Sequence, residues 1–152
     1  MPDELIFMMG EFEARFPTDR LYAKNHMWAQ PQSSGAMRCG FAAYAVRLLQ
    51  DVYFLEWDYA AGTPVSERQK IGFIESSKAE SELFSPLTGV LSTINDELLA
   101  DPSAINTDKY VRGWIFEIAG EIGPLLAPEA YIEHLDSVWE VTQRTIKGQL
   151  NE

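Results

Sequence analysis

The chain has 152 residues, of which 46% are hydrophobic and 12% aromatic, and it carries 23 acidic against 12 basic residues. This length and composition predict one globular domain with a substantial core and exclude a disordered chain. The formal net charge of −11 argues against nucleic acid or an anionic membrane as a partner, because phosphate binding needs clustered lysines and arginines.

The cellular compartment is predicted from the cysteine count and the N-terminal residues. The single cysteine, Cys39, allows no intramolecular disulfide, and we interpret it as a small buried hydrophobe. The first residues include Asp3, Glu4 and Glu11 and no basic residue before Arg15, which is wrong for a secretory or mitochondrial targeting segment. No apolar run is long enough to cross a bilayer. We therefore expect a cytoplasmic protein without a membrane partner.

The N-terminal third of the chain is predicted to contain two helices and two strands. Four apolar side chains near the start follow helical spacing: Leu5, Met8, Phe12 and Phe16. Residues 1–17 are therefore predicted to form a helical extension, which Pro17 ends. Residues 21–28 alternate as in a strand. Residues 41–49 are predicted to form a short buried helix, and residues 52–57 form a core strand.

In the middle of the chain, two β-prone runs flank a short polar segment. The first run is residues 71–74 and the second is residues 90–94, so the chain between them is predicted to close a hairpin. Residues 95–99 are then predicted to form a helical turn, and residues 114–118 form a late strand.

The last predicted element is a helix over residues 128–147, with Pro128 in its first turn. One face of this helix collects Tyr131, Leu135, Val138, Thr142 and Ile146. Short strands separated by Gly and Pro turns predict a mainly β domain with helical additions. We expect residues 1–152 to form one domain, with the helical extension first, a core over residues 20–120, and the C-terminal helix last.

Lys78 is the candidate functional residue, because it is the one lysine in the polar segment Glu75-Ser76-Ser77-Lys78-Ala79-Glu80-Ser81-Glu82. A lysine at a hairpin tip presents its amine to solvent on a rigid base. That geometry suits a covalently attached swinging cofactor. The octet alone equally fits a solvated lysine among carboxylates, since loops are polar by default.

The wider sequence resembles a known family. Residues 72–90, Gly-Phe-Ile-Glu-Ser-Ser-Lys-Ala-Glu-Ser-Glu-Leu-Phe-Ser-Pro-Leu-Thr-Gly-Val, resemble the lipoyl-lysine hairpin of the glycine cleavage system H proteins. The pattern of that hairpin runs Glu-Ser-Val-Lys-Ala, then Ser-Pro and Gly-Glu-Val. Further matching segments follow in the same order between residues 20 and 135: 22–28, 40–56, 95–98, 110–114 and 127–131. The resemblance implies a flattened two-sheet lipoyl/biotinyl-type barrel-sandwich hybrid with N- and C-terminal helices, and lipoate bound covalently to Lys78.

We predict no active site of the protein's own. His26 and His134 are far apart in sequence, and with one cysteine they form no zinc pattern. Nucleophile-elbow, Walker A and dinucleotide-binding motifs are missing from the sequence. A non-catalytic carrier needs none of these, because lipoate supplies a dithiolane for thiol–disulfide exchange and the protein holds and presents it. Glu75, Glu80 and Glu82 are expected either to guide ligase and partner surfaces to the hairpin or simply to solvate the turn.

In H proteins the loaded arm folds back into a cleft, and two of the three cleft positions compared differ here from the family pattern. The cleft's glutamate is replaced by Met27 and a polar helix residue by Leu48, whereas Glu82 keeps its acidic character. A cationic aminomethyl group would lose a carboxylate partner there. The Leu-Gly-Asp that follows the family's helix is also changed, with Gln50 in place of the glycine.

These changes make a lipoylated carrier for sulfur oxidation the leading hypothesis, with two other functions left open. Together with residues 12–17 and 43–49, they resemble the lipoate-binding proteins of bacterial sulfur oxidation, which serve a cytoplasmic heterodisulfide-reductase-like complex. On that interpretation the arm carries sulfur or electrons. The alternative is a glycine cleavage H protein that carries aminomethyl groups between glycine decarboxylase, aminomethyltransferase and dihydrolipoyl dehydrogenase. Either carrier needs a lipoate-protein ligase. The third function is an unmodified interaction module or a lipoyl relay, and loss of modification is disfavoured because Glu75, Lys78 and Ala79 are retained.

Overall fold

The computed structural model describes the backbone of residues 3–150 and the side chains of residues 3–143. The strands, in chain order, are β1 (Glu4–Met9), β2 (Phe12–Pro17), β3 (Leu21–Tyr22), β4 (Met27–Pro31), β5 (Met37–Phe41), β6 (Val52–Trp57), β7 (Thr63–Val65), β8 (Lys70–Ser76), β9 (Glu80–Phe84), β10 (Gly89–Ile94) and β11 (Phe116–Gly120). The helices are α1 (Ala43–Leu49), α2 (Glu97–Ala100), α3 (Ala104–Thr107) and α4 (Pro128–Leu150). The chain is therefore mainly β, as predicted.

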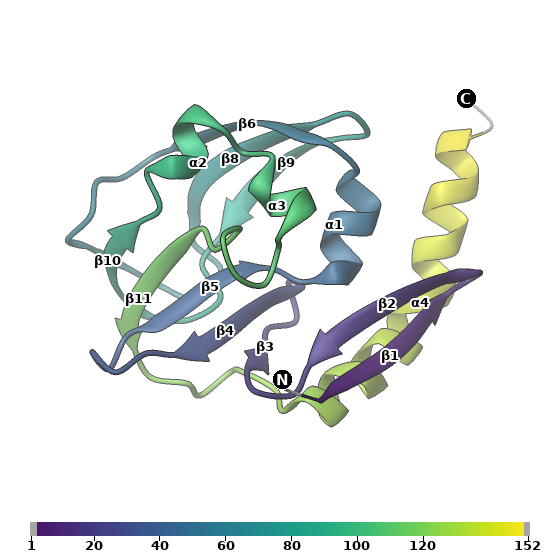
Figure 1. The fold of residues 1–152 in the computed structure, drawn as a ribbon, viewed down its shortest axis with the longest axis horizontal. Coiled ribbons are helices and arrows are strands. Elements are labelled where there is room, and N and C mark those ends of the chain that lie inside the picture. The colour runs from purple at the N-terminus through teal and green to yellow at the C-terminus, as the bar shows by residue number, and fades with distance from the viewer. Residues whose placement is uncertain (1–2, 151–152) are drawn as a thin grey trace.

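Two antiparallel sheets enclose the main core. One sheet has the strand order β3-β4-β5-β11-β10-β7 and the other has the order β6-β8-β9, and Figure 1 shows them facing each other. Val65, Ile74, Leu83, Leu91 and Ile118 point inward from strands of both sheets and belong to one buried cluster. Alternation along each strand sends the intervening side chains outward. The expected two-sheet fold is confirmed.

The second sheet is closely paired at the base of the β8–β9 hairpin, where Gly72 faces β6. A Cβ added at Gly72 would lie 2.5 Å from the Glu56 carbonyl oxygen, so a side chain there would push β6 away from β8. Glycine thus permits the tight pairing of Trp57 with Gly72 and of Gly72 with Leu83. The hairpin that carries Lys78 therefore stands on a closely packed base.

The predicted N-terminal helix is wrong, because residues 4–17 form the β1–β2 hairpin. The helical spacing arises by coincidence, because two strands that each alternate with period two place three of the four apolar residues inward. The fourth, Met8, is 49% exposed on the outer face. The inward series is Leu5, Phe7 and Met9 on β1 and Phe12, Ala14 and Phe16 on β2. Gly10, with φ 66°, supplies the left-handed turn between the strands.

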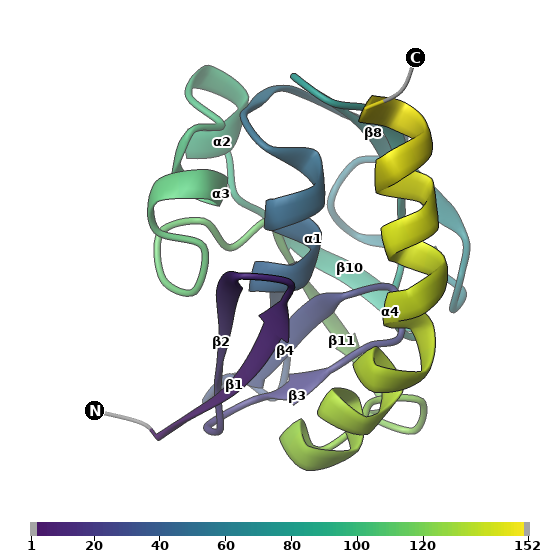
Figure 2. The ribbon, with the colours of Figure 1, turned by 90° about the vertical axis from the view of Figure 1, so that its right-hand side faces the viewer.

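This N-terminal hairpin packs against α1 and α4 around a second, aromatic cluster. Phe7 lies 6.3 Å from Tyr44 of α1 and 6.1 Å from Trp139 of α4, measured between ring centroids. Phe16 meets Tyr131 of α4 edge-on at 5.4 Å. Figure 2 shows α4 running alongside the hairpin and α1. The C-terminal helix is confirmed and extends past its predicted end. The side chain of Ile146, which we placed on its buried face, lies outside the described residues.

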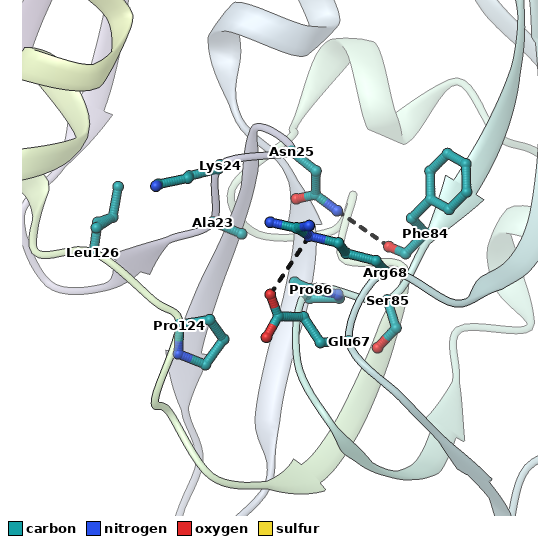
Figure 3. A pocket seen from close by; sticks show the side chains of 10 residues that line it. All are labelled: Ala23, Lys24, Asn25, Glu67, Arg68, Phe84, Ser85, Pro86, Pro124 and Leu126. Atoms are coloured by element: carbon teal, nitrogen blue, oxygen red, sulfur yellow. Dashed lines mark hydrogen bonds and ion pairs between the residues drawn. The ribbon is translucent and has the colours of Figure 1, made fainter.

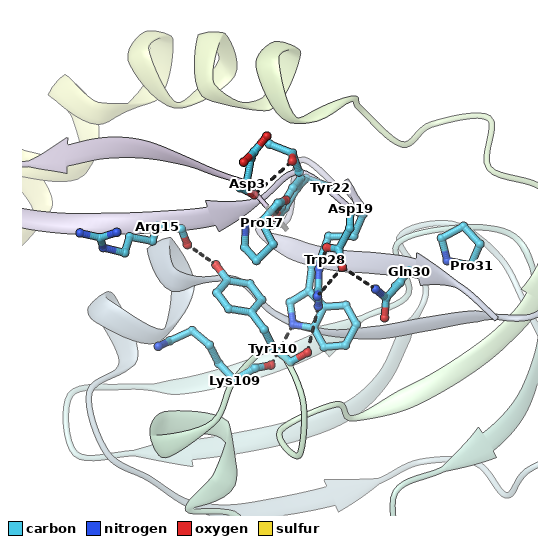
Figure 4. A network of polar contacts seen from close by, with 12 residues as sticks. Asp3, Arg15, Pro17, Asp19, Tyr22, Trp28, Gln30, Pro31, Lys109 and Tyr110 are labelled. Carbon is cyan, nitrogen blue, oxygen red and sulfur yellow. Dashed lines mark hydrogen bonds and ion pairs between the residues drawn. The ribbon is translucent and has the colours of Figure 1, made fainter. Parts of the chain in front are cut away.

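Hydrogen bonds to backbone carbonyls tie the N-terminal hairpin to strand β3 and to the loop between α3 and β11 (Figure 4). The Tyr110 hydroxyl donates to the Arg15 carbonyl at 2.6 Å, and the Tyr22 hydroxyl donates to the Pro17 carbonyl at 2.6 Å. These two carbonyls point away from β1, so the outer edge of β2 is satisfied by the core. The hairpin is thus an integrated part of the structure.

The structure corrects four smaller predictions. Residues 21–28 form two strands, β3 and β4, separated by a tight turn. The partner of the first β-prone run is β9, from within the acidic segment, whereas residues 90–94 belong to β10 in the other sheet. Strands β5 and β7 were missed. The segment between the predicted helical turn and the late strand contains the one-turn helix α3, which was not predicted. The helical turn itself is α2 and the late strand is β11.

No helix among the described residues is both long enough and apolar enough to span a membrane. Within the same residues, His, Cys, Asp and Glu side chains form no group of three or more that could hold a metal ion.

Candidate functional site

Lys78 lies in the turn between β8 and β9, with its side chain exposed to solvent. Ser76 closes this turn: its backbone N–H donates to the Ala79 carbonyl at 2.9 Å, and its hydroxyl accepts from the Ala79 N–H at 3.2 Å. Ser76 itself is 6% exposed, so its hydroxyl is a fixed part of the turn. Among the described residues, no hydrogen bond or ion pair holds the Lys78 amine. The turn is ordered while its lysine is left free to react.

The turn is also fastened to the loop that follows α1. The Ser77 N–H donates to the Asp51 carbonyl at 2.9 Å, and the Asp51 N–H donates to the Ser77 hydroxyl at 3.2 Å. This reciprocal pair joins the residue before Lys78 to a second element. The lysine is therefore positioned by two separate segments of chain, which limits how the tip can rock.

Gln50, next to Asp51, has a strained backbone. Its φ of 61° and ψ of −137° lie in a region that only glycine adopts readily. The Asn106 side chain holds this conformation, since its amide group donates to the Gln50 carbonyl and its oxygen accepts from the Val52 N–H at 2.9 Å. Strain of this kind persists only where the surroundings enforce it. Asn106 of α3 is thus the far support of the loop that fastens the tip.

The outward face of β6, β8 and β9 surrounds the tip with carboxylates and aromatic rings. Phe54, Glu75 and Glu80 form one cross-strand row. Glu56, Phe73 and Glu82 form the next row along the strands. The three glutamates expected near the hairpin therefore lie on one face. Glu56 joins them from β6.

Of the three positions that correspond to the family's cleft, Met27 and Leu48 have packing roles. Met27 is 1% exposed and belongs to the main core cluster, so its side chain is closed off from solvent. Leu48 is half-buried and packs against the aromatic cluster that the N-terminal hairpin completes. Glu82 alone is exposed. The apolar character of Leu48 is therefore explained by the N-terminal hairpin, without reference to any cleft.

His26 has a structural position in the tight turn between β3 and β4. Its φ is 69°, its ring lies 4.4 Å from the Tyr44 ring, and its Nδ1 is 2.9 Å from the Tyr131 hydroxyl oxygen. Burial, with His134 nearby, lowers the pKa of His26 to about 4, whereas burial raises that of Tyr131. Tyr131 therefore keeps its proton, and its hydroxyl shares a hydrogen bond with a neutral imidazole. His26 and His134 come within 6.1 Å between ring centroids, a proximity that their sequence separation hid.

Cys39 is fully buried, as predicted, and burial raises the pKa of its thiol. A thiol in this position is inert.

The tip can accept a covalent group. An exposed primary amine, the small side chain of Ala79 beside it and a fixed backbone leave room for acylation of Lys78 without disturbing the sheet. The residues present therefore fit a lysine-linked cofactor. The structure places Lys78, the residue predicted to carry the cofactor, in an exposed turn. Its supports, which are Asp51, Ser77 and Asn106, were not predicted from the sequence. The one sign of this support in the sequence was the glutamine at position 50, where the family's pattern has glycine.

The chain matches known proteins over most of its length. The family model described as glycine cleavage H-protein matches residues 20–136. A glycine cleavage system H protein of Myxococcus xanthus (strain DK1622) is 43% identical over 102 residues, which cover 67% of this chain and 78% of the relative. A probable glycine cleavage system H protein 1 of Saccharolobus solfataricus is 36% identical over 123 residues, covering 78% and 89% respectively.

Among solved structures, a glycine cleavage system H protein from Mycobacterium marinum superimposes with a TM-score of 0.67 at 30% identity. The match covers 80% of this chain and 98% of the other. The family model begins at residue 20, so the N-terminal hairpin lies outside the part of the chain that it matches.

Proposed function

The chain belongs to the glycine cleavage H-protein family, and we propose that Lys78 is the residue that carries its lipoate. Members of this family are non-catalytic carriers with lipoate attached to a lysine, and they serve partner enzymes. One observation carries the assignment to Lys78: its amine is exposed, without a partner among the described residues, on a turn fastened by Ser76 and Asp51.

The intact mass of the protein tests this assignment. Protein produced with a lipoate-protein ligase is expected to gain one lipoyl group, and Lys78→Ala is expected to lose it completely while keeping its fold. Lys24→Ala, which removes another exposed lysine, is the matched control and retains the modification. Lipoyl mass that persists in Lys78→Ala would contradict the proposal.

The cargo that the relatives' names favour is the aminomethyl group of glycine cleavage. Bound lipoate supplies a dithiolane that exchanges with thiols. The chain's own part is to present the arm: Ser77 and Asp51 hold the tip, and the outward face of β6, β8 and β9 meets the partner. The proposed partners are lipoate-protein ligase, glycine decarboxylase, aminomethyltransferase and dihydrolipoyl dehydrogenase.

A second function, sulfur or electron transfer for a heterodisulfide-reductase-like complex, is favoured by Met27. A buried methionine supplies no carboxylate for a cationic cargo, and a lost charge-assisted contact is worth about 1.5–3 kcal/mol, or about tenfold or more. Leu48 no longer supports this function, because it packs against the aromatic cluster that the N-terminal hairpin completes.

Turnover assays separate the two functions. The lipoylated protein is mixed with glycine decarboxylase, aminomethyltransferase and dihydrolipoyl dehydrogenase, and glycine turnover is compared with that of a Mycobacterium marinum-type H protein. Equal turnover supports glycine cleavage. A loss of about tenfold or more, together with reduction of the arm by a heterodisulfide-reductase-like complex, supports the second function instead.

A further inference from the structure

A cavity of about 510 Å³ lies away from the lysine tip (Figure 3). Four segments meet around it: residues 23–25 between β3 and β4, residues 67–68 between β7 and β8, residues 84–86 at the end of β9, and residues 124–126 before α4. The tip is at the opposite end of β9 from this cavity. Its size lies within the range that holds small-molecule ligands.

The rim of the cavity is positively charged although the chain as a whole is strongly acidic. Lys24 and Arg68 contribute two cations against the single carboxylate of Glu67. The Arg68 Nε lies 3.7 Å from the Glu67 carboxylate and its side chain is 86% exposed, so this ion pair is loose. Within the described part of the chain, Lys24 has no ion pair. Both cations therefore have donors available for an anion.

The frame of the cavity is fixed by hydrogen bonds. The Asn25 side-chain amide donates to the Phe84 carbonyl at 3.2 Å, joining two walls. Arg68 has a left-handed φ of 71°, and its N–H donates to the Ser85 carbonyl at 2.9 Å. In Figure 3 the Arg68 guanidinium reaches across toward Ala23. The arginine is thus placed on the rim by a constrained turn, and the cavity is preformed.

The remaining walls are apolar, formed by Ala23, Pro86, Pro124 and Leu126. We propose that this cavity binds a small amphipathic carboxylate, such as a medium-chain fatty acid. Its carboxylate meets Lys24 and Arg68, and its hydrocarbon chain lies on the apolar walls. The charge and the apolar walls of the cavity both favour this class of ligand. An uncharged hydrocarbon would form no ion pair with Lys24 and Arg68, and an anion without a hydrocarbon chain would leave the apolar walls exposed to water.

An NMR titration of the unlipoylated chain with octanoate, kept below its micelle concentration, tests the proposal. Backbone amides of Ala23, Asn25, Arg68 and Ser85 are expected to shift together and to saturate. Octanamide, which has the same chain without the charge, is expected to bind about fivefold more weakly. Raising the ionic strength is expected to weaken the binding of octanoate and to leave the binding of octanamide unchanged.

Substitutions on the rim give the matched comparison. Lys24→Ala and Arg68→Ala are each expected to weaken the binding of octanoate about twofold to fivefold. Arg112→Ala, an exposed arginine outside the cavity, leaves binding unchanged. Pro124→Asp adds an anion to the apolar wall and is expected to abolish binding. All four positions lie at the surface, and an unchanged thermal midpoint verifies their folds.

Three results would overturn the proposal. Equal affinity for octanoate and octanamide would show that the cations play no part. Shifts centred on the aromatic cluster would locate the ligand elsewhere. Loss of octanoate binding after lipoylation of Lys78 would assign the cavity to the protein's own arm, whereas equal binding before and after supports a separate ligand.

Discussion

The two hairpins of this protein, β1–β2 and β8–β9, are stabilised by opposite means. The N-terminal hairpin turns its inner face into an aromatic cluster with α1 and α4. The lysine hairpin has its tip fastened by hydrogen bonds from Ser76, Ser77 and Asp51, while its outward face remains in solvent. One hairpin contributes stability through burial, and the other uses local polar contacts to position an exposed residue.

This difference implies that damage to the two hairpins will have different consequences. Truncating the N-terminal hairpin should lower the free energy of unfolding and leave the chemistry of the tip intact. Loosening the supports of the tip should cost less stability and affect the presentation of Lys78 more.

The largest expected effect is on the N-terminal hairpin. Phe16 is fully buried, with ring centroids 5.8 Å from Tyr22 and 5.4 Å from Tyr131. Phe16→Ala is expected to lower the free energy of unfolding by about 3–5 kcal/mol, because it removes a large buried ring and leaves a cavity. Urea unfolding measures this. Phe54→Ala, at a ring 41% exposed beside the lysine hairpin, is the control and is expected to cost about 0.5 kcal/mol or less.

The sequence was misleading for the first hairpin because its inner residues fit two periods at once. Leu5, Phe12 and Phe16 satisfy a helical spacing and also the strand alternation, and Gly10 alone marked the turn. The resemblance could not correct this, since the family model starts at residue 20. What decides the conformation is tertiary: the aromatic rings of α1 and α4 cover a flat inner face.

For the lysine hairpin, the sequence singled out Lys78 as the candidate residue and missed the contacts that support it. Lys78 lies in a motif whose spacing is local, so it can be read directly. Asp51 is 26 residues from Ser77, and Asn106 is 56 residues from Gln50, so these contacts exist only after the chain folds. The strand partner was also misassigned, because Glu80 and Glu82 have low strand propensity and are held in β9 by pairing with β8.

The next prediction concerns the effect of low pH on stability, which is expected to act beside the N-terminal hairpin. Burial and His134 lower the pKa of His26 to about 4, below its ordinary value of about 6.5. Above pH 6.5 His26 is neutral whether folded or unfolded, so it has no effect. Between pH 6.5 and 4 the unfolded chain binds the proton more tightly, so stability falls as pH falls, by about 3 kcal/mol in total.

The loss is expected where His26 contacts Tyr44 and Tyr131, next to the N-terminal hairpin. Fluorescence of Trp139, which packs on Phe7 and Tyr44, is the local measurement. His26→Asn keeps a residue that tolerates a positive φ but removes the titration, and it is expected to flatten the pH dependence. Equal pH dependence in this variant would assign the acid sensitivity to other groups.

A smaller effect is expected at the support of the lysine tip. Asn106→Ala leaves the Gln50 carbonyl and the Val52 N–H without their side-chain partner, which costs about 1–3 kcal/mol. Hydrogen exchange is expected to speed up at Ser77, whose N–H bonds to Asp51 of the released loop. Thr107→Ala, at an exposed neighbour on α3, is the control. Unchanged exchange at Ser77 would show that the tip is held without the loop.

The smallest effect expected is a gain of stability at Gln50. Gln50→Gly relieves a backbone conformation that costs about 1–3 kcal/mol in a residue with a side chain. It also loses the bond from the Gln50 side-chain amide to the Arg47 carbonyl and adds freedom to the unfolded chain, so the expected net gain is about 1 kcal/mol.

The turn of the N-terminal hairpin offers the reverse substitution. Gly10 has φ 66°, and nothing lies within 4 Å of a Cβ built there, so Gly10→Ala isolates the cost of a left-handed backbone, about 1 kcal/mol. Opposite shifts of the urea midpoint in the two variants would show that the chain has backbone strain beside Lys78 and none at the turn of the N-terminal hairpin. A loss of stability in both would mean that the Gln50 side chain contributes more than its backbone costs. In that case Gln50 is a support of the loop, and the glycine of the family pattern is no better at this position.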